Sequence, residues 1–208
     1  LVTQVSTPIG PESNLLDTTA ENCRQLRIDA PLLNNRDLAR IRYLEIHGFR
    51  TKNIVAVYPV ASGLDGLERA MTRMFEETNA AIEDGYSFII LSDRGVDADH
   101  AQIPAALATA GVHHHLVRNG KRTRVALVVE SGEPREVHHF AVLLGYGADA
   151  INPYLALETL DDLQRKNIDC RQLDEEAHDA AVGNYIKAVN KGLTKVMSKM
   201  GISTVQSY

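Results

Sequence analysis

Four short apolar runs divide the chain, at residues 54–58, 88–91, 125–129 and 148–151, and helical patterns lie between them. Continuous apolar runs of this length predict strands buried on both faces, and intervening helices predict that the strands pair in parallel. We therefore expect an α/β fold in which parallel strands alternate with helices, as in a partial or degenerate (β/α) barrel.

Apolar residues that recur at steps of three and four predict the helices. The predicted helices cover residues 36–47, 64–83, 103–118, 134–144 and 184–200. The third would bury one face made of Ile103, Leu107, Ala110, His114 and Val117. Residues 1–35 show no sustained period and predict an extended connection, and residues 202–205 predict the start of a strand.

Polar residues follow three of the predicted strands: Ser92, Asp93 and Arg94, then Glu130, then Asn152. In parallel α/β folds, ligands and catalytic groups sit at the carboxyl ends of the strands. The cluster could hold a polar substrate, with Glu130 as general base beside Asp93. Alternatively, Asp93 and Arg94 pair with one another and Asn152 bonds its own loop, the interpretation that we favour because such contacts are common at strand ends.

Composition narrows the class of protein. The 208 residues allow one large domain or one and a half, and the net charge of −5 argues against nucleic-acid and anionic-membrane partners. Cys23 and Cys170 have no metal-site spacing and indicate reduced thiols of an intracellular, cytoplasmic protein. No run is long enough to cross a bilayer. The first residues carry neither Met nor a signal pattern, so we expect the chain to be incomplete at this end.

The histidines and glycines do not predict a cofactor site. His113, His114 and His115 are consecutive, so on a helix they point about 100° apart and cannot converge on one metal ion. His114 is expected to be a packed core imidazole. Gly145 and Gly147 precede a predicted strand, whereas a dinucleotide site needs glycines after one, so they predict a helix end and turn.

The last predicted helix carries a row of four lysines spaced four residues apart, Lys187, Lys191, Lys195 and Lys199. Like charges at this spacing repel one another. The row is either a solvated face or a surface that docks against acidic groups in a larger assembly.

Long stretches of the chain resemble the glutamate synthase large subunit. They include residues 185–193 (YIKAVNKGL) and 195–204 (KVMSKMGIST), at the junction of that family's central and FMN-binding domains. Residues 91–95, 111–116, 137–140 and 145–154 agree as well, and residues 10–16 and 30–33 are similar to the central domain. The resemblance covers essentially the whole chain.

This resemblance implies a place within a larger enzyme. Residues 1–180 would be the central linker domain, and residues 181–208 the connecting helix and the first residues of the FMN-binding barrel. The family hydrolyses glutamine at an amidotransferase domain, passes ammonia through a tunnel and makes glutamate from 2-oxoglutarate at FMN and a [3Fe–4S] cluster. Its partners would be those flanking domains and either a small NADPH-oxidising subunit or ferredoxin.

No catalytic, flavin or cluster motif of the family occurs in this chain, so the resemblance implies no catalytic, cofactor-binding or metal-binding residue here. It implies a spacer and ammonia-tunnel wall, with Ser203, Thr204 and Tyr208 beside the tunnel. The alternative is a small stand-alone enzyme that uses Asp93, Arg94, Glu130 and Asn152.

Overall fold

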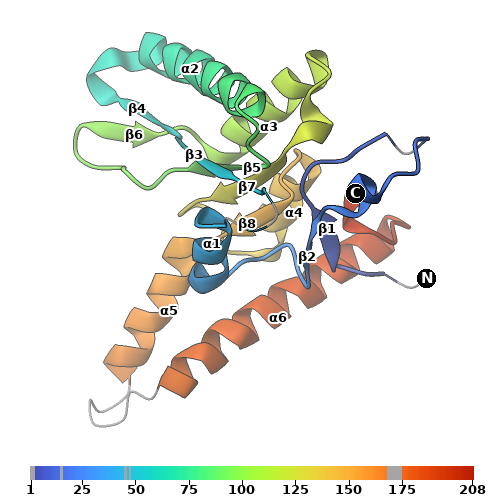
Figure 1. The fold of residues 1–208 in the computed structure, drawn as a ribbon. Coiled ribbons are helices and arrows are strands. Elements are labelled where there is room, and N and C mark those ends of the chain that lie inside the picture. Colours follow the sequence, from blue (N-terminus) through green and yellow to red (C-terminus); the bar gives the residue numbers. More distant parts are fainter. Residues whose placement is uncertain (1–2, 15, 45, 47, 168–174) are drawn as a thin grey trace.

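A computed structural model describes residues 3–14, 16–44, 46, 48–167 and 175–208. Four parallel strands form the main sheet in the order β3-β5-β7-β8, with helices between them in the chain (Figure 1). The strands are β3 (Thr51–Val55), β5 (Phe88–Ser92), β7 (Ala126–Glu130) and β8 (Ala150–Asn152). The helices are α1 (Asn35–Arg42), α2 (Gly63–Glu83), α3 (Ala105–Arg118), α4 (Val137–Gly145), α5 (Tyr154–Asn167) and α6 (Glu175–Lys199). The predicted parallel α/β class is confirmed; among the described strands the sheet is open and does not close into a barrel.

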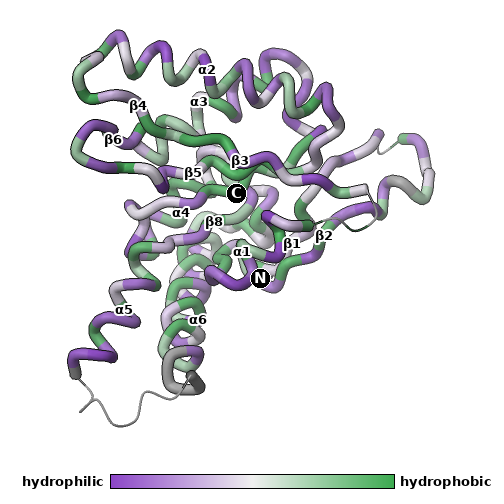
Figure 2. Tube along the Cα trace, turned by 60° about the vertical axis from the view of Figure 1, so that its left-hand side comes forward, coloured by the Kyte–Doolittle hydropathy of each residue, from purple (hydrophilic) through white to green (hydrophobic). Residues whose placement is uncertain are grey.

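Side chains of the central strands alternate between two buried faces. Ile89, Leu91 and Leu127 pack toward α2 and α3, whereas Phe88 and Ile90 point to the opposite face. All five residues of both β5 and β7 are buried, which explains why these strands appear as unbroken apolar runs. The hydropathy colouring of Figure 2 shows the same apolar centre, with hydrophilic residues gathered on the outer helices.

The N-terminal segment covers the second face of the sheet. It forms a small antiparallel pair, β1 (Thr7–Ile9) with β2 (Leu26–Ile28), around a short 3-10 helix η1 (Ala20–Cys23). Ile9, Ile28, Leu38, Ile41 and Phe49 pack there against the inner side chains of β5 and β7. The prediction of a plain extended connection over residues 1–35 was wrong, because three-residue strands are too short to show a period.

The first apolar run also divides differently from the prediction. β3 ends at Val55, and a further strand, β4 (Val57–Pro59), pairs antiparallel with β6 (His100–Gln102). Short 3-10 helices η2 (Val60–Ser62) and η3 (Arg122–Arg124) precede α2 and β7. At the end of the chain, residues 202–205 form no strand: Thr204 makes one isolated bridge to Gln4, and η4 (Val205–Ser207) follows.

The predicted helices are present, with changes at their ends. α1 is shorter than residues 36–47 and begins after Asn34, whose side chain accepts a hydrogen bond from the Asp37 amide at 2.7 Å. α5 was missed, and α6 begins nine residues before its predicted start. α6 crosses position 180 without a break, so the helix boundaries do not mark the predicted division into residues 1–180 and 181–208. The division stays a prediction.

The predicted buried face of α3 was wrong except for Ile103, which is buried but lies just before the helix begins. Leu107 and Val117 are 43% and 50% exposed, and His114 lies in solvent rather than in the core. The helix instead buries Ala105, Ala108, Thr109, Val112 and Leu116. Both stripes are mainly apolar, so the pattern alone could not decide between them. In the part of the chain that the structure describes, no helix is long and apolar enough to cross a membrane.

Candidate functional site

Glu130 is the centre of the polar cluster at the carboxyl edge of the sheet. It ends β7, and its side chain is 2% exposed. Ser92 Oγ donates a hydrogen bond to Glu130 Oε2 at 2.5 Å, and Arg42 donates to the same oxygen at 2.7 Å. Arg94 Nε donates to Oε1 at 2.8 Å. Both carboxylate oxygens are thus used within the chain, and two guanidinium groups hold the buried charge.

Asp93 is satisfied in the same way by a separate set of donors. Ser131 Oγ donates to its carboxylate at 2.6 Å and the Gly132 amide at 3.1 Å. The Tyr154 hydroxyl also bonds Asp93, and burial together with this bond raises the pKa of Tyr154. Asp93 therefore joins the loop after β7 to the first residue of α5.

Arg94 links Glu130 to α5 rather than pairing with Asp93. Its guanidinium carbon lies 4.0 Å from the centre of the Tyr154 ring, and its second arm donates to Glu158 at 2.8 Å. Burial alone would lower the pKa of Arg94, but the hydrogen bonds to Glu158 and Glu130 outweigh it and raise the pKa. Arg94 is thus a permanent cation in a fixed position.

Asn152 was expected to bond its own loop, and this was wrong. Its amide nitrogen donates to the Leu33 carbonyl and to Asn35 Oδ1, both at 3.0 Å. The N-terminal segment causes this, because it runs along the edge of β8: the Leu33 amide donates to the Ile151 carbonyl at 2.8 Å, and the Ile151 amide donates to the Pro31 carbonyl at 2.7 Å. The sequence did not predict this contact, because Leu33 and Asn152 are 119 residues apart.

The structure therefore brings Asp93, Arg94, Glu130 and Asn152 to one edge, as predicted, but in a closed arrangement. A general base needs a free lone pair beside space for a substrate. The cavity that touches Asp93, Glu130 and Ser131 measures about 10 Å³. That is about the space of one water molecule. We call this set the strand-end lock, because it ties the strands to α1 through Arg42 and to α5 through Tyr154 and Glu158.

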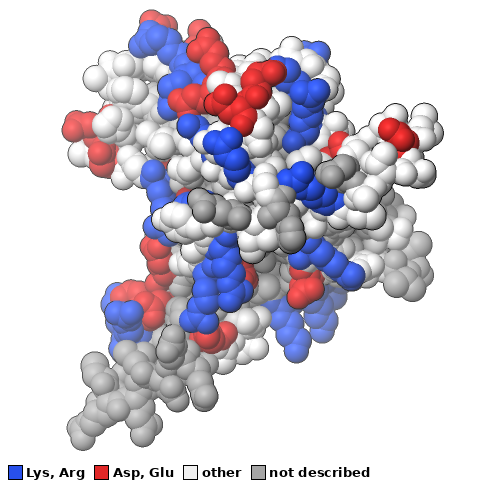
Figure 3. Space-filling model, in the orientation of Figure 1, with Lys and Arg blue, Asp and Glu red and all other residues white. Residues whose placement is uncertain are grey.

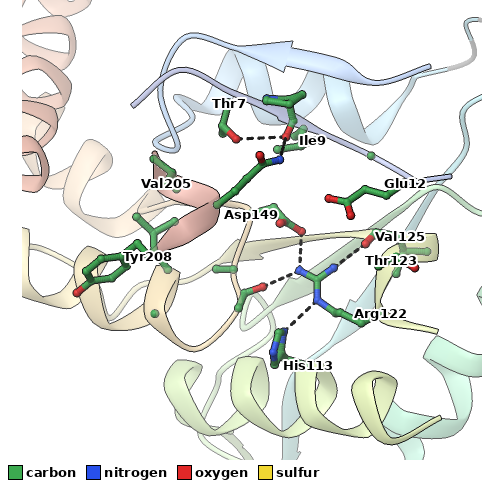
Figure 4. Close-up of a pocket in the computed structure, with 17 residues that line it drawn as sticks. Thr7, Ile9, Glu12, His113, Arg122, Thr123, Val125, Asp149, Val205 and Tyr208 are labelled. Carbon is green, nitrogen blue, oxygen red and sulfur yellow. Dashed lines mark hydrogen bonds and ion pairs between the residues drawn. The ribbon is translucent and has the colours of Figure 1, made fainter. Parts of the chain in front are cut away.

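A larger cavity, of about 270 Å³, lies at the opposite, amino-terminal edge of the sheet (Figure 4). It is lined by five separate parts of the chain, which no motif in the sequence brings together. Its lining residues are Thr7, Pro8, Ile9, Gly10, Glu12, His113, Arg122, Thr123, Val125, Leu144, Gly145, Gly147, Ala148, Asp149, Val205, Gln206 and Tyr208. We call it the amino-edge cavity.

Arg122 builds the floor of the amino-edge cavity. It donates to the Gly147 carbonyl and to Asp149 Oδ2, both at 2.9 Å, and to His113 Nδ1 at 3.0 Å (Figure 4). His113 must therefore accept at Nδ1, and burial together with the charge of Arg122 lowers its pKa. Asp149 Oδ2 also accepts from the Leu127 amide at 2.7 Å, which fixes the start of β7.

The three predicted tunnel-side residues separate in the structure. Tyr208 is half-buried and lines the amino-edge cavity together with Val205 and Gln206. Ser203 and Thr204 are exposed; Gln4 donates to the Ser203 carbonyl at 2.8 Å, and Thr204 bonds Ser207. Of the three, only Tyr208 is among the residues that line this cavity.

The remaining candidates give no metal centre. Among the described residues, no three His, Cys, Asp or Glu side chains are placed to hold an ion. His113, His114 and His115 project in different directions: His113 bonds Arg122, and His115 stacks on Phe75 with ring centres 4.6 Å apart. Cys23 is an exposed free thiol, and Cys170 lies outside the described residues.

Comparison with known proteins agrees with the sequence resemblance. Residues 1–208 match the family description of the glutamate synthase central domain. The chain belongs to this family. It is 42% identical over 208 residues to the glutamate synthase [NADPH] large chain of Bacillus subtilis, covering all of this chain and 13% of that protein. It is also 42% identical over 202 residues to the glutamate synthase [NADH] of Schizosaccharomyces pombe, covering 96% of this chain and 9% of that protein.

A plant relative, the chloroplastic ferredoxin-dependent glutamate synthase of Oryza sativa, is 35% identical over 216 residues and is covered to 13% of its length. This central-domain chain thus spans a small part of the curated relatives that it matches. Among solved structures, the flavin-binding domain of baker's yeast flavocytochrome b2 matches with a TM-score of 0.47 at 18% identity, over 64% of this chain and 30% of that one.

Proposed function

We propose that this chain is the central part of a glutamate synthase, an oxidoreductase that makes glutamate from glutamine and 2-oxoglutarate. In it, the segment acts as a spacer and as part of the ammonia-tunnel wall between the glutaminase and FMN sites, and supplies no reacting group. The relatives named as glutamate synthases support the parent activity. The closed strand-end lock supports the proposal that the segment supplies no reacting group, because the carboxylate oxygens of Asp93 and Glu130 accept hydrogen bonds from donors within the chain.

The residues present do not fit the cofactors of such an enzyme. The cavity beside Asp93 and Glu130, at about 10 Å³, is far too small for a flavin. An iron–sulfur cluster is held by cysteine thiolates, and the chain has only Cys23 and Cys170. FMN and a [3Fe–4S] cluster would therefore be held elsewhere in the parent enzyme, which we place in the cytoplasm. The electron donor, whether a small NADPH-oxidising subunit or ferredoxin, would bind there as well.

The amino-edge cavity supports the tunnel-wall role, since Tyr208 and Gln206 line it. Replacing Gln206 with Trp would fill part of the cavity, because Gln206 is a lining residue. The change should be tolerated, because Gln206 is exposed and its bond to the Pro8 carbonyl is long, at 3.4 Å. Ser207→Trp is the matched control, because Ser207 is exposed and is not a lining residue.

The assay compares glutamate formed with glutamine hydrolysed in the intact synthase. Gln206→Trp is expected to lower this ratio as ammonia escapes, with the activity on added ammonia retained, while Ser207→Trp keeps the ratio of the parent. Equal ratios for both variants would show that the amino-edge cavity is not part of the tunnel wall.

The stand-alone enzyme remains the alternative, and it makes a different prediction for Asp93→Ala and Glu130→Ala. Turnover of some substrate should collapse while folding persists. Under the proposed function both changes lower stability instead, because each leaves buried or half-buried donors without a partner.

A further inference from the structure

Four lysines occupy the solvent side of α6. Lys187, Lys191, Lys195 and Lys199 are all exposed, whereas the helix buries Val189, Leu193 and Met197. At 100° per residue, the lysines lie on the side of the helix opposite these three apolar residues. Figure 3 shows basic atoms along the lower side of α6. We call these four residues the lysine ridge.

No acidic group within the described chain neutralises the lysine ridge. From position 180 to 199, α6 contains no Asp or Glu. Asp179, just before, pairs with Arg36 at 3.4 Å. Elsewhere in the chain two lysines do find partners: the half-buried Lys121 pairs with Glu83, and the exposed Lys166 pairs with Asp162. The ridge lysines make no such pair among the residues that the structure describes.

The ridge is electrostatically unfavourable in the chain as it stands, because like charges four apart on a helix repel one another. A surface helix usually intersperses both signs of charge. An uncompensated row of one sign is complementary to a surface that carries carboxylates. The net charge of −5 makes a nucleic acid or an anionic membrane a poor partner for the same ridge.

The weakness of exposed ion pairs indicates where the acidic surface lies. Each exposed ion pair contributes little binding free energy. Four of them therefore cannot offset the translational and rotational entropy that two separate molecules lose when they associate. They suffice where a covalent connection already holds the two surfaces close together, because the effective concentration is then high. Under the proposed function, neighbouring domains are connected to this chain in that way.

We propose that the lysine ridge docks on an acidic surface of another domain of the same polypeptide. The inference rests on the proposed function only in placing the chain within a larger one. Its test measures the reactivity of lysine side chains, whereas the test of the proposed function measures ammonia transfer. The docking proposal and the tunnel-wall proposal can therefore fail independently.

The test is the acetylation rate of each lysine in the intact large chain, followed by peptide mass spectrometry at about 50 mM and about 500 mM NaCl. Docked lysines should be acetylated faster at high salt, by roughly fivefold to tenfold, because screening releases them. A solvated ridge should be acetylated at nearly the same rate at both salt concentrations, because water already reaches its amino groups at low salt. Unchanged or slower rates at the ridge overturn the proposal.

A pair of charge-matched variants gives the control. In Lys191→Glu/Lys195→Glu, the remaining Lys187 and Lys199 should reach their high-salt rates already at low salt. Lys52→Glu/Lys166→Glu changes the charge equally elsewhere and should leave the ridge rates as in the parent. A zero-length carbodiimide cross-link should join ridge lysines to carboxylates outside residues 1–208. Cross-links only within this chain, or ridge lysines that are protected regardless of salt, would contradict an acidic partner domain.

Discussion

The contact between α4 and α6 predicts opposite effects for two glycine-to-alanine changes on the same helix. A Cβ at Gly192 would lie 2.4 Å from Val137 Cγ2, 2.8 Å from Cγ1 and 3.1 Å from Cβ. Rotating the valine does not relieve this, because all three atoms are close. A Cβ at Gly183 would meet no atom within 4 Å.

The magnitudes follow from two opposing contributions. Alanine is favoured over glycine inside a helix by about 1 kcal/mol, and this gain applies to both variants. At Gly192 the extra carbon must also push α6 away from α4, and overpacking of this kind costs about 1–3 kcal/mol or more. We expect Gly183→Ala to be more stable than the parent by up to ~1 kcal/mol, and Gly192→Ala to be less stable by ~1–2 kcal/mol.

Urea denaturation followed by circular dichroism measures both free energies of unfolding. The parent chain is the reference, and Gly183→Ala controls for helix propensity. If the two variants are equally stable, the close approach of α4 and α6 does not exist, and α6 is not fixed to the sheet as described.

Further predictions concern the amino-edge cavity. Gly147 has φ +105°, and a Cβ there would lie 2.1 Å from His113 Nδ1. Gly147→Ala should therefore lower the free energy of unfolding, measured by urea denaturation, by about 2–4 kcal/mol. A loss below about 1 kcal/mol would refute the contact. Burial and Arg122 lower the pKa of His113 from 6.5, so its neutral form contributes stability that is lost as pH falls below that value. His113→Asn should therefore lose less stability than the parent between about pH 7.5 and about pH 5.5. An equal loss in both would assign the pH dependence to other groups.

The strand ends were predictable because parallel strands carry their carboxyl ends to one edge of a sheet. Asp93, Glu130 and Asn152 meet there as expected. Their partners were not predictable: Arg42 lies 88 residues before Glu130, and Leu33 lies 119 residues before Asn152. Whether such a cluster is open or closed depends on those distant partners.

The face of α3 shows a second limit of the sequence. Its two stripes are both mainly apolar, and the helix buries the one made of Ala105, Ala108, Thr109, Val112 and Leu116. Apolar periodicity favours the larger side chains, such as Leu107, which packing leaves exposed. The amino-edge cavity was missed because five separate segments form it, and none of them carries a motif on its own.

The central claim is that the chain contributes geometry and no reacting group, and Glu130→Gln in the intact synthase tests it most directly. Turnover per bound FMN should stay within about twofold of the parent, because both carboxylate oxygens of Glu130 already accept hydrogen bonds, from Arg42, Ser92 and Arg94. The free energy of unfolding of the 208-residue chain should fall by about 2–4 kcal/mol, because Arg42 and Arg94 lose their shared charge. A fall in turnover of about 10²-fold or more, with stability unchanged, would instead make Glu130 a catalytic acid or base and contradict the account.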